Sequence, residues 1–505
     1  MASEVASEAR SAPGRTAAAL PAFAVGPVLG VAVLQVGLLS ALSGRYGFHR
    51  DELYFMAAGH HLAWGYVDQP PLTPLLARGS TELFGDSPYG LRVVATLAAA
   101  AVVVVVAFIA RELGGGRGPQ ALAAACVAVS GFVLAVGHMV STATFDLLAW
   151  LVIAWLALRL LRTADGRWWL PLGVAVGVGA QNKYLVALLV AVLLVGVLAV
   201  GPRDALRGWW PVAGVLVAAA IALPTLVWQA RHGWPQLDVA RGIAEDDGTE
   251  NRIGLIPGQL VFLSPVFIPI WIYGAVRLWR DADVRWARPL VVAYPLLLVA
   301  VLAIGGKPYY AFPLLIVLLA AGCQPLLERG LRARRGLVTA VALSLAVNAY
   351  LVLPLVPESG LGVPNKVDKE QGEQVGWPEL ADAVAAGWQQ IPESDRPRAV
   401  VLANNYGEAG ALDRYGPARG LPAPYSGHMA YADWRRPPDR ADGPVLIVRQ
   451  KDAAGTDRYF TDCREVGQVH NNHGVDNEED GSRVVLCAGP HEIWSALWPR
   501  LRHYY

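Results

Sequence analysis

Long apolar segments separated by short polar turns fill the first 356 residues of the chain. A helix needs about 20 apolar residues to cross the hydrocarbon core of a bilayer. The hydrophobic pattern therefore predicts about eleven membrane-spanning helices. They cover residues 20–42, 91–110, 120–140, 143–162, 169–182, 184–200, 209–228, 256–279, 289–305, 309–327 and 337–356. The weakest boundary is at Gln181-Asn182-Lys183, because these three residues alone interrupt the apolar run from 169 to 200.

The connections between these segments alternate in charge. Cytoplasmic loops of membrane proteins carry an excess of Lys and Arg. If the N-terminus is cytoplasmic, eleven spans put the arginine-rich connections on one side, at Arg111, Arg117, Arg159, Arg162, Arg167, Arg203, Arg207, Arg280, Arg285, Arg288, Arg329, Arg332, Arg334 and Arg335. The outer side then receives the first loop (43–90), the acidic loop 229–255, and the tail from Pro357.

The two ends of the chain differ from this pattern. Residues 1–16 are polar and rich in Ala and Ser, which predicts a disordered cytoplasmic tail. The first apolar run is too long for a signal-peptide core, so we expect a retained first helix in a membrane domain that covers 17–356. Residues 357–505 contain short strand-like runs between helical stretches, which predicts a small extracytoplasmic α/β domain.

Composition supports a multi-pass membrane protein, since 54% of the residues are hydrophobic and only 16% are charged. A net charge of +1 gives no reason to expect a nucleic-acid partner. Cys463 and Cys487 fall in the outer domain, where they can form a disulfide or remain two unpaired thiols. The cysteine spacing is not that of a metal site.

The first outer loop combines acids, histidines, aromatic residues and a Pro-Pro pair beside the membrane. Ionisable groups at that boundary are costly unless they are solvated, paired or functional. The apolar pattern around Leu53–Ala57 predicts a helix that lies along the membrane surface. We expect Asp51 and Glu52 to be catalytic, although solvated helix-capping acids are the alternative. The candidate substrate-binding residues in this loop are His60, His61, Tyr66 and Asp68.

Another acid, Asp146, begins the predicted span 143–162 and is a third catalytic candidate. Its alternative role is to cap that helix. A divalent cation held by Asp51, Glu52 and Asp146 is compatible with the sequence, but no ligand spacing demands one.

Cations on the outer side are the candidates for binding a phosphate. Lys183 and Lys307 are the only lysines before residue 357, and both occupy predicted outer turns. A lysine there suits a lipid-linked phosphate, and snorkelling to the interface is the alternative. Arg78 and Arg92 are also expected either to bind the phosphate or to snorkel to the interface. Tyr309 and Tyr310, which follow Lys307, are expected to contact substrate or to belong to the interfacial aromatic belt.

Taken in order, four motifs resemble the GT-C glycosyltransferases, and most closely family 39, which groups protein O-mannosyltransferases with aminoarabinose-transferase-like enzymes. They are Asp51-Glu52, Pro70-Pro71-Leu72, Asp146 and Lys307-Pro308-Tyr309-Tyr310. In the tail, the segment 404–411 followed by 413–416 is similar to the outer domain of uncharacterised bacterial members.

The resemblance implies a mainly helical membrane fold with amphipathic helices in the first outer loop. It also implies a polyprenyl-phosphate sugar donor and a catalytic aspartate, which is Asp51 by match, with Asp146 as a second acid. Lys183, Lys307 and Arg92 become candidates for the donor phosphate. Aminoarabinose-transferase-like members often have Lys before the Pro-Pro pair, where this chain has Gln69.

The predicted function is inverting transfer of a hexose or pentose from a polyprenyl phosphate to a hydroxyl of a protein, lipid or cell-wall glycan. A transporter or flippase of lipid-linked sugars is an alternative, but the sequence lacks the internal repeats that transporters often show. A second alternative is a glycan-binding membrane protein that uses aromatic residues of the tail.

Overall fold

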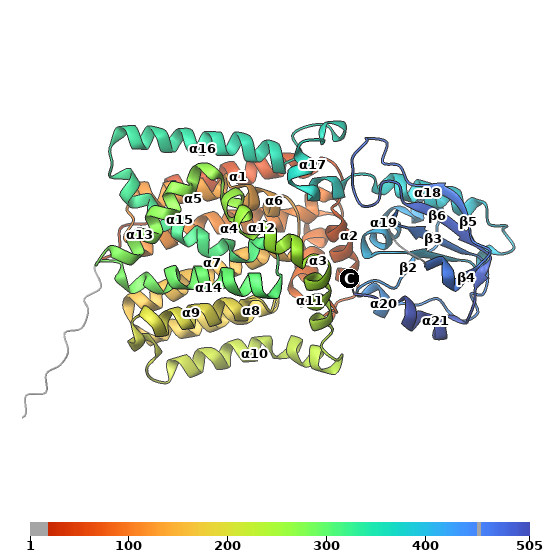
Figure 1. Cartoon of the computed structure of the whole chain (residues 1–505), viewed down its shortest axis with the longest axis horizontal. Helices are drawn as coiled ribbons and strands as arrows, with labels where there is room; N and C mark the ends of the chain where they lie inside the picture. The colour runs from red at the N-terminus through yellow and green to blue at the C-terminus, as the bar shows by residue number, and fades with distance from the viewer. Residues whose placement is uncertain (1–18, 452–455, 505) are drawn as a thin grey trace, which may run out of the picture.

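The computed structural model describes residues 19–451 and 456–504. A bundle of helices forms the larger part, and a smaller α/β unit lies against one end of it (Figure 1). The region where they meet is called the junction below. The predicted disordered tail, 1–16, lies outside the described residues.

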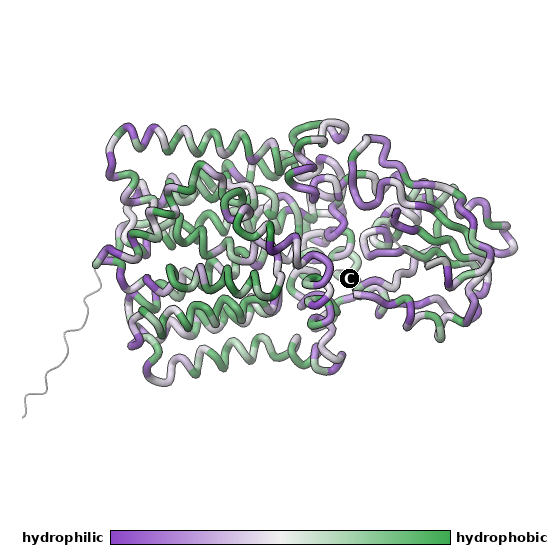
Figure 2. Tube along the Cα trace, viewed as in Figure 1, coloured by the Kyte–Doolittle hydropathy of each residue, from purple (hydrophilic) through white to green (hydrophobic). Residues whose placement is uncertain are grey.

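Apolar residues cover the bundle along its length, and polar residues gather at its ends (Figure 2). Helix α15 is the most buried of the candidate spans, and α10 and α16 lie at two edges of the bundle (Figure 1). The bundle helices are α1 (Val25–Leu42), α4 (Pro88–Glu112), α5 (Arg117–Ala128), α6 (Gly131–His138), α7 (Thr142–Thr163), α8 (Trp169–Ala180), α9 (Val186–Val200), α10 (Trp210–Arg231), α12 (Gly248–Leu263), α13 (Ile268–Arg280), α14 (Arg288–Ile304), α15 (Phe312–Leu327) and α16 (Leu331–Val352).

Each predicted span coincides with a helix or a bent pair of helices, but the count of eleven is not confirmed. Within the described residues, seven helices are long and apolar enough to cross a membrane, or up to nine if each bent pair is one span. The pair α5–α6 bends by 62°, and the pair α12–α13 bends by 80°. Pro265 explains the second bend, because a proline disfavours helical geometry in the residue before it, here Ser264 with φ 146°. The turn at Lys183 leaves α8 with 12 residues and α9 with 15.

Shorter helices cover the junction end of the bundle. They are α2 (Arg50–His60), α3 (Leu72–Phe84) and α11 (Pro235–Asp246). Helix α2 starts with a capping box: the His49 side chain accepts a hydrogen bond from the Asp51 N–H, and the Glu52 carboxylate accepts one from the His49 N–H. This cap fixes where α2 begins, and it puts the two predicted catalytic acids in the first turn.

The α/β unit contains a five-stranded sheet of order β2-β1-β3-β6-β5. Strand β1 is parallel to β2 and β3, whereas β6 is antiparallel to β3 and β5. The strands are β1 (Val400–Ala403), β2 (Tyr425–Ser426), β3 (Val445–Arg449), β5 (Arg464–Gln468) and β6 (Arg483–Cys487), and β4 (Phe460–Thr461) pairs separately with β7 (Gly489–Pro490). The disulfide between Cys463 and Cys487 is present.

The two faces of this sheet have different neighbours. One face packs against α21 (Trp494–Leu501) through Trp494 and Trp498. The other face packs against α18 (Trp377–Gln389) and α19 (Tyr406–Tyr415), and its hydrophobic core continues to Leu53 and Tyr54 of α2. Helix α2 therefore shares one core with the α/β unit. Three short helices, η6 (Glu358–Gly360), α17 (Pro364–Val367) and η7 (Lys369–Gln374), connect α16 to α18, and α20 (Tyr431–Trp434) follows β2.

Candidate active site

Glu52 and Arg92 form a fully buried ion pair at the junction. The Arg92 guanidinium contacts the Glu52 carboxylate at 2.7 Å through Nη2 and at 2.9 Å through Nε. The N–H groups of His49 and Val140 donate to the same carboxylate. Burial opposes ionisation of Glu52, but the charge and hydrogen bonds of Arg92 together with the backbone donors lower its pKa.

The remaining Arg92 donors are also engaged. They reach the carbonyls of Ser43 and Gly47, both at 2.7 Å, and the side chain of Gln374 at 3.1 Å. The pair thus joins α2, α4 and the segment before α18. This geometry favours a structural role for both residues, in place of the predicted catalytic role of Glu52 and the predicted phosphate contact of Arg92.

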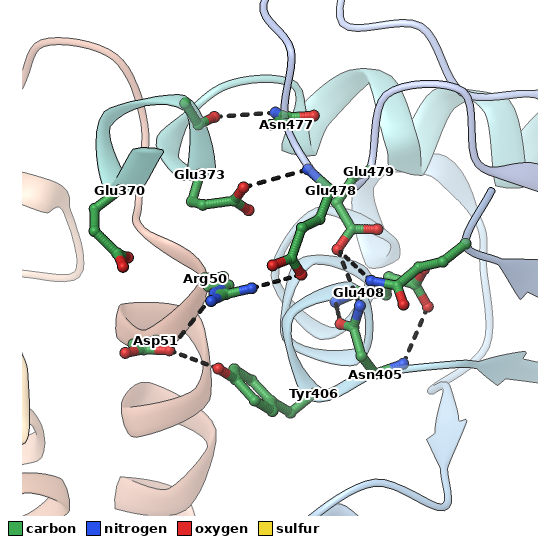
Figure 3. A network of polar contacts seen from close by, with 12 residues as sticks. Arg50, Asp51, Glu370, Glu373, Asn405, Tyr406, Glu408, Asn477, Glu478 and Glu479 are labelled. Atoms are coloured by element: carbon green, nitrogen blue, oxygen red, sulfur yellow. Dashed lines mark hydrogen bonds and ion pairs between the residues drawn. The ribbon is translucent and has the colours of Figure 1, made fainter. Parts of the chain in front are cut away.

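Asp51 has a different environment, although it is the next residue along the chain. Its side chain is 32% exposed. The hydroxyl of Tyr406, in the first turn of α19, donates to Asp51 Oδ1 at 2.8 Å (Figure 3). Arg50 lies 4.0 Å from the same oxygen and forms an ion pair of 2.6 Å with Glu478. Asp51 is therefore a carboxylate that is held from one side and remains partly open to solvent.

Asp146, Lys183, Tyr309 and Tyr310 form a second cluster, in which the charges of Asp146 and Lys183 interact. Asp146 is buried, and its Oδ1 has no hydrogen-bond partner among the described residues. The ammonium group of Lys183 lies 4.6 Å from the ring centre of Tyr310 and 5.6 Å from that of Tyr309. The structure therefore brings together four site residues that the sequence predicted separately.

Hydrogen bonds at the Pro70-Pro71-Leu72 motif connect the first loop to the turn that carries Lys183. The Leu72 N–H donates to the Gln181 carbonyl at 2.9 Å, and the Thr73 hydroxyl donates to Asn182 at 2.7 Å. Asn182 in turn donates to the Thr142 carbonyl, where α7 begins. The turn that carries Lys183 is thus tied to both α3 and α7.

Lys307 pairs with Asp247 and lines a polar cavity of about 820 Å³ at the junction. Bundle residues line one part of it, and the segment 358–373 and the α/β unit line the rest. Charged side chains dominate the lining, and they are Arg50, Asp247, Glu250, Lys307, Glu358, Lys366, Lys369, Glu370, Glu373, Lys451, Asp476 and Glu478. Four of the five lysines of the chain contribute to this cavity.

Glu370 is ionised at one edge of the cavity. His49 Nε2 lies 2.8 Å from its carboxylate. This hydrogen bond and the charges of Arg50 and Lys307 lower the pKa of Glu370 to about 2. Glu370, His49 and Arg50 were not predicted as site residues. Only the proximity of Arg50 and His49 to Asp51 in sequence gave a signal.

The other predicted residues of the first loop have mainly structural contacts. Tyr66 is buried and donates to the carbonyls of Ala58 and His61. Asp68 accepts from Tyr54 at 2.6 Å, and burial raises the pKa of Asp68 to about 6. His60 is exposed, and His61 stacks on Trp434 with ring centres 4.7 Å apart.

Arg78 forms an exposed ion pair with Glu82 at 2.7 Å. Neither Arg78 nor Glu82 lines the polar cavity that contains Lys307. Among the described residues, no three His, Cys, Asp or Glu side chains are arranged to hold a metal ion.

Three carboxyl groups at the junction favour the protonated form. Burial raises the pKa of Glu373 to about 7, against the opposing charge of Arg50. Burial and the neighbouring Glu479 raise the pKa of Glu408, and burial raises the pKa of Glu479. Figure 3 shows Glu408 and Glu479 near the start of α19, and Glu373 on the separate segment that also carries Glu370.

These groups predict that the folded protein loses stability as the pH rises above about 4.5. Glutamate in an unfolded chain titrates near that pH, so the folded protein retains protons that the unfolded chain releases. The contribution of Glu373 is complete below about pH 4.5 and is lost as the pH rises through about 7, and the raised pKa values of Glu408 and Glu479 act in the same direction. We expect the melting temperature of the detergent-solubilised protein to fall between about pH 5 and 8, and Glu479→Gln to flatten this dependence. The exposed Glu465→Gln is the control, and an equally steep fall in the Glu479→Gln protein would refute the assignment.

Comparison with known proteins agrees with this fold. The family described as dolichyl-phosphate-mannose-protein mannosyltransferase matches residues 68–228. A lipid A galacturonosyltransferase, RgtD of Rhizobium johnstonii, is 26% identical over 279 residues, which are 52% of this chain and 56% of the relative. This chain thus aligns with little more than half the length of that relative.

Two solved structures of ArnT from Cupriavidus metallidurans share the architecture. The form bound to undecaprenyl phosphate superposes with a TM-score of 0.58 at 16% identity, covering 92% of this chain and 99% of that one. The apo form gives 0.56 at 15% identity with the same coverage. At this identity the likeness establishes the fold, a GT-C membrane fold with a small sheet-containing unit at its C-terminal end. Together with the family and sequence matches, it confirms the resemblance to GT-C glycosyltransferases of the family 39 type.

Proposed function

We propose that this protein is a membrane glycosyltransferase that moves a sugar from a polyprenyl-phosphate donor to an acceptor hydroxyl. The observation that carries the proposal is the partly exposed Asp51 carboxylate, which follows Arg50 in the chain, because Arg50 lines the charged cavity together with Lys307. The family match and RgtD support this class of enzyme, and ArnT, which shares the fold, was solved with undecaprenyl phosphate. No comparable observation favours a transporter or a glycan-binding protein.

In this proposal Asp51 is the general base. It accepts the proton of the acceptor hydroxyl as that oxygen attacks the anomeric carbon of the sugar. The bond between the anomeric carbon and the phosphate oxygen breaks, and polyprenyl phosphate leaves from the opposite face, so the configuration inverts. Lys307 and Lys183 stabilise the negative charge that develops on the leaving phosphate. Asp146, with its unpartnered buried oxygen beside Lys183, is the second acid of the site.

We further propose that the junction faces the outside of the cell membrane, with the N-terminus in the cytoplasm. The distribution of arginines supports this orientation. The disulfide between Cys463 and Cys487 supports it as well, since disulfides persist in oxidising compartments. In this division, residues 17–356 form the catalytic membrane domain and 357–505 the extracytoplasmic domain.

The proposed function is tested with the purified full chain in lipid nanodiscs. Polyprenyl phosphates that carry a labelled hexose, pentose or hexuronic acid serve as donors, the last because RgtD is a galacturonosyltransferase. Envelope lipid, protein and glycan fractions serve as acceptors. Transfer of label together with release of polyprenyl phosphate supports the proposal. Failure of every donor to exceed a heat-inactivated sample would reject it.

Lys307 gives a prediction about donor binding. Lys307→Ala should raise the KM for the donor about tenfold at low salt, because a phosphate partner is lost while Asp51 is intact. The difference should shrink at high salt, since salt screens charges in a partly exposed cavity. Arg464→Ala, which removes an exposed charge on β5, is the control. Unchanged donor KM in the Lys307→Ala enzyme at low salt would exclude the phosphate role.

A further inference from the structure

Residues 404–411 of the α/β unit contain the start of α19, which several hydrogen bonds fix in place. The Asn405 side chain accepts a hydrogen bond from the Glu408 N–H at 2.8 Å. The Glu408 carboxylate accepts from the Asn405 N–H at 3.2 Å and from the Asn404 N–H at 2.6 Å. These reciprocal bonds form a capping box. They fix Tyr406 at the first position of the helix.

Two glycines of the same segment allow α19 to approach α2 closely. A Cβ at position 410 would lie 2.8 Å from Leu53 Cβ, and a Cβ at position 407 would lie 3.1 Å from Arg50 Cβ. A side chain at position 410 would force the helices apart, because real Cβ atoms do not approach other atoms that closely. The glycines therefore allow the contact that brings the Tyr406 hydroxyl to Asp51.

The Tyr406 side chain has a defined place at this contact. Its ring centre lies 4.9 Å from that of Tyr54 and 5.1 Å from that of His428. Burial and the nearby Asp51 carboxylate raise the pKa of Tyr406. The phenol therefore keeps its proton at neutral pH and donates to Asp51 Oδ1.

We propose that Tyr406 is a positioning residue for Asp51 and that the α/β unit completes the active site through it. The phenol holds Oδ1 by a hydrogen bond, which fixes the carboxylate rotamer and leaves Oδ2 to take the acceptor proton. Arg50, anchored to Glu478 of the same unit, supports the backbone next to Asp51. This inference rests on the proposed function, because it assumes that Asp51 is the base.

The proposal explains why the site uses residues 355 positions apart in the chain. The bundle alone supplies Asp51 at the partly exposed start of α2. A free aspartate side chain samples several rotamers, and a misplaced base loses much of its effect. When the α/β unit packs against α2, the hydrogen bond from Tyr406 restricts the Asp51 side chain to one rotamer.

The test compares Tyr406→Phe with wild type in the full chain. The variant removes one hydroxyl and keeps the ring. We expect kcat to fall about 10- to 100-fold while the donor KM stays within about twofold and the melting temperature stays within a few degrees. Tyr415→Phe, at the other end of α19, is the matched control and should retain wild-type kcat.

A double-variant comparison separates positioning from a general structural effect. In the Asp51→Asn background, Tyr406→Phe should cause no further loss of the residual rate, because the carboxylate that it positions is gone. Independent losses that multiply would overturn the proposal, and so would wild-type kcat in Tyr406→Phe. If the Phe variant is unstable, 3-fluorotyrosine at position 406 keeps the fold and changes donor strength. A changed kcat then supports the proposal, and an unchanged kcat overturns it.

The outcomes also distinguish this inference from the proposed function. If Asp51→Asn abolishes transfer and Tyr406→Phe does not affect it, only the positioning role fails. If Asp51→Asn itself transfers sugar at the wild-type rate, the assignment of the base fails first.

Discussion

Asp51→Asn is expected to lower kcat for sugar transfer by about 10²- to 10⁴-fold, the range that a positioned general base contributes. The amide has the shape of the carboxylate, and its oxygen can still accept the Tyr406 hydrogen bond. It cannot accept a proton from the acceptor hydroxyl. The measurement is the initial rate of polyprenyl phosphate release at saturating donor, together with the melting temperature of each protein.

The control for this prediction is Asp86→Asn. Asp86 is an exposed acid of the same loop and pairs with Arg414. Removing it tests whether loss of any loop carboxylate slows transfer. Transfer by Asp51→Asn within about threefold of wild type would show that another group is the base.

Asp51 is preferred to Glu52 as the base because of what surrounds each carboxylate. Glu52 has no exposed surface, and its two oxygens accept bonds from Arg92 and two backbone N–H groups. A carboxylate stabilised in this way is a weak base. Asp51 is partly exposed and, among the described residues, its side chain has Arg50 at 4.0 Å and a hydrogen bond from the Tyr406 hydroxyl.

The sequence predicted the acidic pair, and the family resemblance favoured Asp51, but the residues alone did not divide the roles of Asp51 and Glu52. Successive residues on an α-helix point about 100° apart, because each turn contains 3.6 residues. One of two neighbouring acids can therefore be buried while the other is partly open to solvent. Which one does so depends on the position of Arg92, 40 residues further along the chain, and no local pattern records that position.

Predictions from hydrophobicity succeeded where one physical rule determines the outcome. The length needed to cross a bilayer located a helix or a bent pair in each predicted span. The bends at residues 129–130 and 264–265 were missed, because the apolar pattern continues across both breaks. From the sequence, Tyr406 was only one of the aromatic residues of the tail, within the segment 404–411. Its contact with Asp51 depends on packing between two distant segments, which a single sequence does not reveal.

The buried pair of Glu52 and Arg92 gives the largest expected effect on stability. Arg92→Met leaves the Glu52 carboxylate buried without its cation, and loss of one partner of a buried ion pair costs about 3–5 kcal/mol. Glu52→Gln should destabilise the protein for the converse reason. The double variant Glu52→Gln/Arg92→Met should recover much of the loss, since neither charge then remains buried. Denaturant titration of the detergent-solubilised protein measures the change in the free energy of unfolding.

Comparison with an exposed ion pair shows how much of the expected loss in the free energy of unfolding comes from burial. Arg241→Met breaks an exposed pair with Asp238, and such pairs contribute less than about 1 kcal/mol. We expect Arg92→Met to be far more destabilising than Arg241→Met, with donor KM unchanged in the fraction that stays folded. Equal, small losses of stability together with a raised donor KM would contradict the structural role. Arg92 would then be a ligand of the donor phosphate, and Glu52 would be released to compete with Asp51 as the base.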